Sequence, residues 1–190
     1  MILGRTHVAG GVFHAAREAS QPVVLRLRRL RGMAAYVAVV GAGRATADEE
    51  RIAEDVGRRL AAAGAVIVCG GLGGVMEAAC RGAKSSDGKT VGILPGTSRA
   101  DANPFVDVAL PTGLGELRNG LVVRAADAVV AVGGEFGTLS EIALALKAGK
   151  PVVAVGGWEL SRAGQPVDEI ERAETAGDAV ALVLAACQRA

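Results

Sequence analysis

Short apolar runs alternate with longer amphipathic stretches from residue 36 onward, and no other property of the sequence restricts the fold as much. The first run, YVAVVG (36–41), is continuous and rich in β-branched residues, as expected of a strand that is buried on both faces. In the stretch that follows, Ile52, Val56 and Leu60 recur at helical spacing, and Gly64 comes directly after the last turn. This spacing, with a glycine stop signal, predicts a helix after the first strand.

The same cycle repeats along the chain. Strands are predicted at 36–41, 65–70, 90–95, 105–110, 127–134 and 151–157, and helices at 46–64, 74–85, 115–126, 137–149 and 176–188. The polar stretches 96–104 and 158–169 are predicted to be loops. Apolar strands that alternate with helices indicate a parallel sheet covered on both faces. We therefore predict an α/β fold, a three-layer, doubly wound parallel sheet of Rossmann-like type in a single domain.

The charge is divided unevenly along the chain. Residues 1–32 carry six arginines and one glutamate, a net charge of +5, which leaves −4 on residues 33–190 because the whole chain carries +1. We expect residues 33–190 to form the domain and residues 1–32 to be a basic N-terminal extension that is disordered or precedes the native start. A targeting presequence and an interaction tail are the alternatives. The mildly acidic domain gives no reason to expect a polyanionic partner.

Composition excludes several classes of function. Three cysteines without a CxxC pair argue against a disulfide framework and a structural zinc site, and they suit a reducing cytoplasm. Both histidines, His7 and His14, precede the predicted domain, which leaves no imidazole in it for a Ser-His-Asp triad or a histidine metal site. The five aromatic residues are too few for nucleic-acid stacking platforms, and no apolar run approaches the roughly 18 to 20 residues of a membrane span. We expect a cytoplasmic protein with no metal, nucleic-acid or membrane partner.

Glycine-rich turns follow three of the predicted strands. Glycines follow the first strand (Gly41, Gly43), the second (Gly70, Gly71, Gly73, Gly74) and the fifth (Gly133, Gly134, Gly137). In such sheets the carboxyl ends of the strands form the ligand crevice, where glycine lets backbone N–H groups approach a phosphate. A single glycine turn is often structural, but three on one sheet edge favour a small ligand that carries phosphate.

Two common nucleotide motifs do not fit. A dinucleotide fingerprint needs a third glycine where GAGRAT (41–46) has Thr46, and an acid where the second strand ends in Cys69 and Gly70, so NAD-dependent redox chemistry is not expected. The segment AKSSDGKT (83–90) is close to a P-loop, but it ends a helix and leads into a strand, the reverse of a P-loop. Lys89 is therefore interpreted as a turn residue.

Residues 117–146 hold the densest set of reactive side chains. Thr138, at a predicted helix start, can cap free N–H groups or donate to a phosphate, and Glu141 lies one turn further on the same face. Arg118 opens the preceding helix and can clamp a phosphate. The alternative interpretations are an acid that only stabilises the helix dipole and an ordinary surface arginine.

These residues carry a family resemblance. The segment GGEFGTLSE (133–141), with Arg118 placed 23 residues before Glu141, resembles the PGGxGTxxE motif of the LOG-like, "possible lysine decarboxylase" group of Rossmann-fold nucleotide-binding proteins. CGGLGGVMEAA (69–79) resembles the family's second glycine turn. NPFVDVALPTG (103–113), followed by the pair Arg118 and Asn119, is similar to the branch related to DprA/Smf and to molybdenum-cofactor carrier proteins. The resemblance covers residues 36 to about 158.

The resemblance implies roles for named residues. Glu141 and Arg118 match the catalytic glutamate and arginine, and the phosphate- or nucleotide-binding candidates are Gly41, Gly43, Gly71, Gly73, Gly74, Gly133, Gly134, Gly137, Thr138, Asn119 and Thr112. The chain departs from the motif where Gly133 replaces its proline and Glu135 its second glycine, and where Glu116 and Leu117 replace a His-Glu pair. These departures argue against cytokinin-nucleotide specificity, and no motif for lysine decarboxylation is visible.

Two functions follow from this resemblance. The first is a phosphoribohydrolase that cleaves the N-glycosidic bond of a nucleoside 5′-monophosphate without a required cofactor, with Glu141 stabilising the oxocarbenium-like transition state. The alternative is a non-catalytic carrier that binds a nucleotide or a phosphorylated pterin such as molybdenum cofactor. Phe136 is the candidate for stacking on the ligand's ring. The resemblance further implies a homo-oligomer, a dimer or larger.

Overall fold

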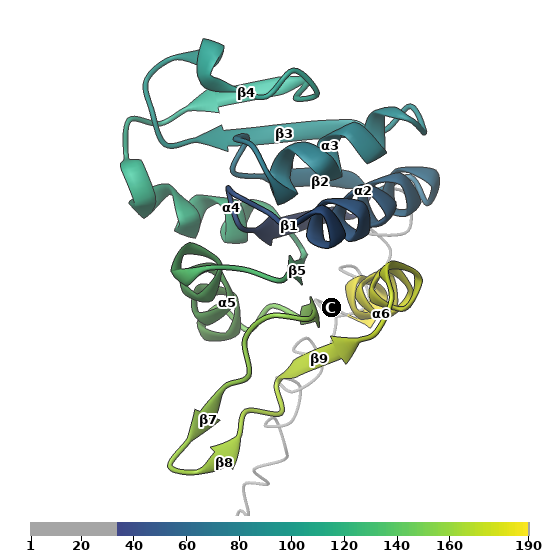
Figure 1. The fold of residues 1–190 in the computed structure, drawn as a ribbon, viewed down its shortest axis with the longest axis vertical. Coiled ribbons are helices and arrows are strands. Elements are labelled where there is room, and N and C mark those ends of the chain that lie inside the picture. The colour runs from purple at the N-terminus through teal and green to yellow at the C-terminus, as the bar shows by residue number, and fades with distance from the viewer. Residues whose placement is uncertain (1–33, 190) are drawn as a thin grey trace, which may run out of the picture. The chain divides into compact units, whose positions relative to one another are not determined.

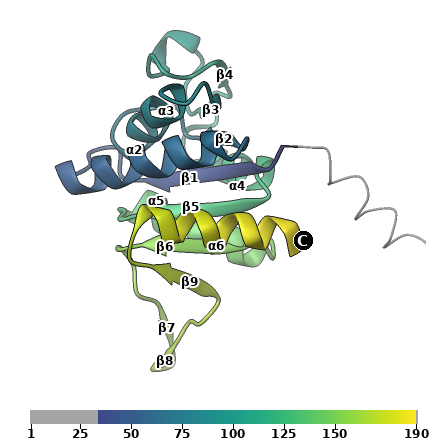
Figure 2. The same cartoon turned by 90° about the vertical axis from the view of Figure 1, so that its right-hand side faces the viewer.

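The computed structural model describes residues 34–189 (Figure 1), and the predicted basic extension 1–32 lies outside the described residues. Within the described part, the sheet strands are β1 (Tyr36–Gly41), β2 (Val66–Cys69), β3 (Lys89–Leu94), β4 (Val108–Pro111), β5 (Ala128–Val132), β6 (Val152–Val155) and β9 (Ile170–Ala173). The helices are α2 (Ala47–Ala62), α3 (Val75–Lys84), α4 (Asn119–Ala125), α5 (Phe136–Lys147) and α6 (Ala176–Arg189), with short 3₁₀ turns η1 (Arg99–Asp101) and η2 (Gly115–Arg118). A small hairpin of β7 (Ser161–Arg162) and β8 (Gln165–Pro166) extends beyond the sheet (Figure 2).

The strand order places the ends of β1 and β5 at the point where the sheet changes direction. The order is β4-β3-β2-β1-β5-β6-β9, and every neighbouring pair is parallel. The chain therefore builds outward from β1 to β4 and then returns to add β5 on the other side of β1. Ligands of doubly wound folds bind outside the carboxyl ends of the strands at such a point.

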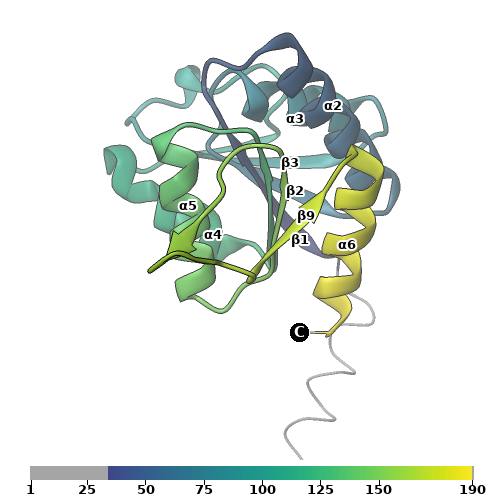
Figure 3. The same cartoon turned by 60° about the horizontal axis from the view of Figure 1, so that its bottom comes forward.

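Two apolar clusters cover the two faces of the sheet. On one face, α2, α3 and α6 pack on residues such as Val39, Ile67 and Val130. On the other face, α4 and α5 pack on residues such as Val40 and Val129, and Figure 3 shows the two groups of helices on opposite sides. Neighbouring strand residues thus point into different layers, which explains the continuous apolar runs. The predicted three-layer, doubly wound α/β fold is confirmed.

Four details of the prediction were wrong. The stretch 158–169, predicted to be a loop, contains the antiparallel β7–β8 hairpin, because its two strands are too short and too polar to give an apolar run. The edge strand β9 was missed because it has only four residues, IERA, of which the two central ones are charged and exposed. The predicted strand 105–110 starts later, at Val108, because the Phe105 carbonyl accepts a hydrogen bond from the Thr90 hydroxyl instead of joining the ladder. The predicted helix 115–126 is a 3₁₀ turn followed by a short α-helix.

The backbones of α2 and α3 touch where the two helices cross, because each helix has a glycine there. A Cβ atom at Gly82 would overlap the carbonyl oxygen of Glu54, and one at Gly57 would overlap the carbonyl oxygen of Ala79. The Gly82→Ala variant is expected to lower the free energy of unfolding by about 1 to 3 kcal/mol, because the helices must separate to admit a methyl group. Chemical denaturation measures this loss.

Gly120 provides the matched control for Gly82. It lies in α4, and a Cβ atom there would meet nothing within 4 Å. Gly120→Ala is expected to leave stability unchanged or to raise it by up to about 1 kcal/mol, since alanine is the better helix former. Equal losses in the two variants would contradict the claim that helix contact, rather than glycine itself, matters at Gly82.

Candidate functional site

The turns after β1 and β2 pack directly on each other at the carboxyl edge of the sheet. Gly74 has a φ of +63°, and a Cβ atom there would overlap the carbonyl oxygen of Ala42. The first N–H of α3, from Val75, donates to the same carbonyl at 3.1 Å. Gly41 fits against the side chain of Val75 and the Val132 carbonyl. These glycines therefore bring two turns within backbone contact.

The turn after β5 requires glycine at two successive positions. Gly133 and Gly134 have φ values of +53° and +121°, a region that other residues rarely adopt. A Cβ atom at Gly134 would lie 2.6 Å from the Cβ of Thr138, and one at Gly133 would overlap the carboxylate of Glu49. Glu135, which replaces the motif's second glycine, has an extended backbone with φ −98°, so a side chain is tolerated there.

The first turn of α5 has no side-chain cap. Glu135 is its N-cap residue, and no side-chain hydrogen bond is made to the helix start. By contrast, α2 begins with a complete capping box in which Thr46 and Glu49 satisfy each other's backbone N–H groups. Because an uncapped first turn leaves N–H groups unpaired and partially positive, α5 offers a better anion site than α2. Thr138 lies in this turn and is only 2% exposed.

Arg118 and Glu141 form a buried pair beside this turn. Arg118 ends η2 and Glu141 lies in the second turn of α5, with their residues 8% and 6% exposed. Nη1 of Arg118 lies 3.6 Å from Oε1 of Glu141, too far for a good hydrogen bond. Nε of Arg118 is buried and has no hydrogen-bond partner among the described residues. The guanidinium is therefore only partly satisfied.

Burial dominates the electrostatics of the pair. It raises the pKa of Glu141 from 4.5 to about 7, although the nearby Arg118 opposes the shift. Burial also lowers the pKa of Arg118, which Glu141 opposes. A carboxyl group that titrates near neutral pH can both accept and donate a proton. The two predicted catalytic residues therefore lie together, with burial acting against the charged form of each.

Backbone close to the pair fixes its position. A Cβ atom at Gly70 would lie 2.5 Å from Nη1 of Arg118, so the guanidinium rests on the bare backbone at the end of β2. Asn119 follows Arg118 and donates from Nδ2 to the Ser140 hydroxyl at 2.9 Å, joining α4 to α5. We define the Arg118–Glu141 site as these two side chains with Gly70 and the first turn of α5.

The other predicted binding residues differ in how they relate to the Arg118–Glu141 site. Gly134, Gly137 and Thr138 belong to the turn of α5, and Gly71, Gly73 and Gly74 to the turn after β2. The Thr112 hydroxyl is engaged by backbone, because it donates to the Leu94 carbonyl at 2.8 Å. Gly43 is exposed, whereas Gly41 serves packing. The amide of Asn119 is bonded to Ser140, so its role is to hold α4 against α5.

Two contacts at this edge were not predicted from the sequence, namely that of Glu49 with Gly133 and that of Phe136, the stacking candidate, with Trp158. The Glu49 carboxylate accepts from the Thr46 N–H at 2.8 Å and covers Gly133. The Thr46-x-x-Glu49 spacing could have revealed the capping box but not the contact with a turn 84 residues away. The exposed Phe136 pairs with Trp158 at a ring distance of 5.4 Å, and the indole N–H donates to the Glu135 carbonyl.

The described residues contain no group of three or more His, Cys, Asp or Glu side chains placed to hold a metal ion. Cys69 and Cys80 are buried free thiols whose sulfur atoms lie 3.5 Å apart. Contact with Cys69 and burial both raise the pKa of Cys80. Among residues 34–189, no helix combines the length and apolar character required to cross a membrane.

Solved structures with a known ligand share this fold. The molybdenum cofactor binding protein of Rippkaea orientalis has a TM-score of 0.73 and 33% identity, over 80% of this chain and 97% of that one. The molybdenum cofactor carrier protein of Chlamydomonas reinhardtii has a TM-score of 0.70 and 30% identity, over 81% and 98% of the two chains. DNA processing protein A of Helicobacter pylori, a single-stranded DNA binder, has a TM-score of 0.60 at 21% identity over 83% of each chain, which shows a common fold.

Sequence comparison points to the same group. An uncharacterised protein of Archaeoglobus fulgidus is 46% identical over 119 residues, which span 63% of this chain and 78% of that protein. The model of the SLOG cluster4 family matches residues 34–183. The LOG-like resemblance, with its carrier-like and DprA-related branch, is thereby confirmed. The chain belongs to the SLOG cluster4 family.

Proposed function

We propose that the protein binds a phosphorylated pterin of the molybdenum cofactor class at the Arg118–Glu141 site, as a carrier or binding protein. The observation that carries this proposal is the buried Arg118 guanidinium, whose Nε lacks a partner among the described residues, beside the uncapped first turn of α5. Support also comes from the two proteins named for molybdenum cofactor, which match four fifths of this chain at 30% identity or more.

A phosphate is expected to bind on the α5 side of the Arg118–Glu141 site and not on the Gly133 side. The N–H groups of Phe136, Gly137 and Thr138 open α5, and helix N-termini stabilise anions. Glu49 covers Gly133 and would repel a phosphate there, so the phosphate is expected to approach from Gly134 to Thr138. Since the pKa of Glu141 is about 7, its neutral form is available at physiological pH and can donate a hydrogen bond rather than repel the ligand. The departure at Glu135 is compatible with this placement because that residue is exposed.

Retention of the cofactor tests the proposal. The full chain is incubated anaerobically with molybdenum cofactor released from a molybdoenzyme, desalted, and assayed for retained pterin by fluorescence after oxidation. We expect near-stoichiometric pterin that inorganic phosphate at high concentration displaces. Absence of retained pterin at cofactor concentrations well above those of the protein would refute the assignment.

A second function is favoured by one observation, the pKa of Glu141. A carboxyl group that titrates at about 7 can orient water and stabilise positive charge on a ribose during N-glycosidic hydrolysis. In this mechanism Arg118 positions a nucleoside 5′-monophosphate and the first turn of α5 holds its 5′-phosphate. AMP is the probe, and enzymatic detection of ribose 5-phosphate is the measurement. Release that is equal in Glu141→Gln and in the wild type, or no release at all, would exclude this activity.

The remaining expectations stay predictions. A homo-oligomer is part of the proposal, and it is supported by exposed leucines just before η2 (Leu114), on η2 (Leu117), on α4 (Leu121) and on α5 (Leu144), because an interface would cover such apolar side chains. Light scattering measures the oligomeric state directly. A cytoplasmic location and the lack of a nucleic-acid partner are likewise predictions that fractionation and DNA-binding assays check.

A further inference from the structure

Asn103 holds the turn that follows β2. Its side chain is buried, with the residue 8% exposed, and its Nδ2 donates to the Leu72 carbonyl at 2.9 Å. Its backbone N–H donates to the Gly71 carbonyl, also at 2.9 Å. Its Oδ1 accepts from the Phe105 N–H at 3.1 Å. One residue, 31 positions away in sequence, thus binds two successive carbonyls of a glycine turn.

That turn supports Arg118. Gly70, which precedes the two carbonyls, lies against the guanidinium so closely that a Cβ atom would be 2.5 Å from Nη1 and Nη2. Gly71 has a φ of +75°, and a Cβ atom there would lie 2.6 Å from the Leu94 side chain. A displacement of this turn would therefore move the surface on which the guanidinium rests. Asn103 reaches the Arg118–Glu141 site through Gly71 and Gly70, and its hydrogen bonds go to Gly71, Leu72 and Phe105 rather than to either charged side chain.

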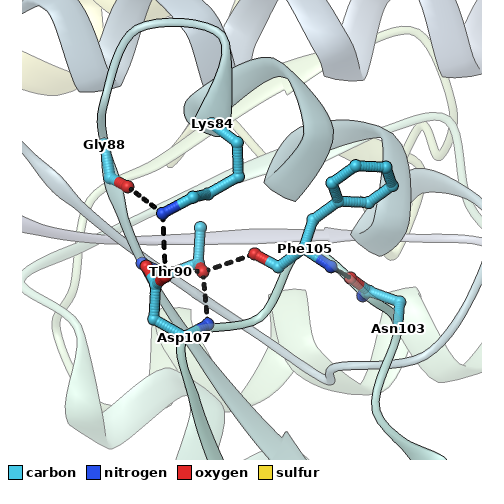
Figure 4. Close-up of polar contacts among 6 residues, drawn as sticks. All are labelled: Lys84, Gly88, Thr90, Asn103, Phe105 and Asp107. Atoms are coloured by element: carbon cyan, nitrogen blue, oxygen red, sulfur yellow. Dashed lines mark hydrogen bonds and ion pairs between the residues drawn. The ribbon is translucent and has the colours of Figure 1, made fainter.

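The far end of the same segment is anchored elsewhere. Figure 4 shows Asp107, which accepts from the Thr90 N–H at 2.9 Å and from the Lys84 ammonium at 2.7 Å. The Thr90 hydroxyl donates to the Phe105 carbonyl and accepts from the Asp107 N–H. Thr90 is near the start of β3, at the opposite edge of the parallel sheet from the site. Asp107 therefore stabilises the segment without contacting the turn after β2.

We propose that Asn103 is a positioning residue that sets the Gly70–Gly74 turn beneath Arg118 and thereby the geometry of the ligand site. The identity of the ligand in this inference rests on the proposed function, whereas the contacts of Asn103 with the turn do not depend on it. It gives a role to the Asn103–Gly113 motif, of which the proposed function uses no side chain. The effect of Asn103 is transmitted by backbone, because both carbonyls it binds belong to the turn.

Asn103→Ala and Asp107→Ala form a matched pair of variants. Each removes several hydrogen bonds of one segment, one at the site end and the other at the far end. We expect Asn103→Ala to weaken retention of molybdenum cofactor, or binding of AMP, by about tenfold, since the Leu72 carbonyl loses its side-chain donor and the turn is then held only by the backbone bond to Gly71. Asp107→Ala is expected to lower the melting temperature to a similar or larger extent while leaving the affinity unchanged.

A ligand-free readout keeps the inference testable if neither probe binds. The pKa of Glu141, measured by carbon-13 NMR titration of its carboxyl group, depends on where the Arg118 guanidinium lies. Asn103→Ala should shift this value and Asp107→Ala should not. If the wild type retains neither probe, the proposed function fails and the NMR result alone decides the positioning role. Unchanged affinity and unchanged Glu141 titration in Asn103→Ala, or equal changes in both variants, would overturn it.

Discussion

Replacing Arg118 with methionine is expected to weaken retention of molybdenum cofactor by about 100-fold or more, because truncating one partner of a buried charge pair costs several kcal/mol. The guanidinium has an unpartnered Nε among the described residues and rests on the backbone at Gly70. Methionine keeps a similar length, so the packing on Gly70 is largely preserved. Cofactor retention after desalting measures the loss.

Two further variants separate charge from geometry at this position. Arg118→Lys keeps the positive charge but loses the planar fork of donors, and intermediate retention is expected. Arg124→Met removes an exposed arginine from the last turn of α4, the helix that starts directly after Arg118, and should retain the cofactor as the wild type does. If Arg118→Met retains cofactor as Arg124→Met does while remaining folded by circular dichroism, the ligand does not use the Arg118–Glu141 site.

The loss of Arg118 also has an expected effect on its neighbour. The nearby cation lowers the pKa of Glu141 against the larger effect of burial. In Arg118→Met this opposing influence disappears, so the pKa of Glu141 should rise further. An NMR titration distinguishes this electrostatic change from a general loss of folding, which would return the carboxyl group toward its ordinary value.

The sheet and its glycine turns were predictable because local sequence encodes them. Continuous β-branched runs such as 36–41 indicate burial on both faces of the sheet. Gly133 and Gly134 indicate a backbone with positive φ, which few other residues adopt. Parallel strands end at one edge, so Arg118 and Glu141 were expected at the same edge of the sheet. Their joint role was implied by the LOG-like resemblance, and their burial as a pair was not predicted.

The support around the pair was not predictable from such patterns. The contact of Asn103 with the carbonyls of Gly71 and Leu72 joins segments that no periodicity relates. The burial of Arg118 depends on the absence of a side chain at Gly70, which the sequence shows only as one more turn glycine. The short edge strand β9 lacks the continuous apolar run of the central strands because an edge strand has only one neighbour.

The raised pKa of Glu141 links stability to pH. Burial moves it from 4.5 to about 7, so between these values the folded protein holds a proton that the unfolded chain has released. The free energy of unfolding must then decrease as the pH rises through this window, and the contribution of Glu141 to stability is complete below pH 4.5 and lost above about pH 7. Ligand binding at Arg118 should accompany proton uptake near neutral pH, because an anion favours the neutral carboxyl group.

Glu141→Gln is expected to remove this pH dependence. Relative to the variant, the wild type should lose up to about 3 kcal/mol of unfolding free energy between pH 5 and pH 8, since each pKa unit corresponds to about 1.4 kcal/mol. Urea denaturation at a series of pH values measures the difference. Glu116→Gln, which removes an exposed carboxylate from η2, should leave the slope of the wild type intact. A constant difference between wild type and Glu141→Gln across this range would mean that Glu141 is ionised throughout, in which case it could not donate a hydrogen bond to a phosphate.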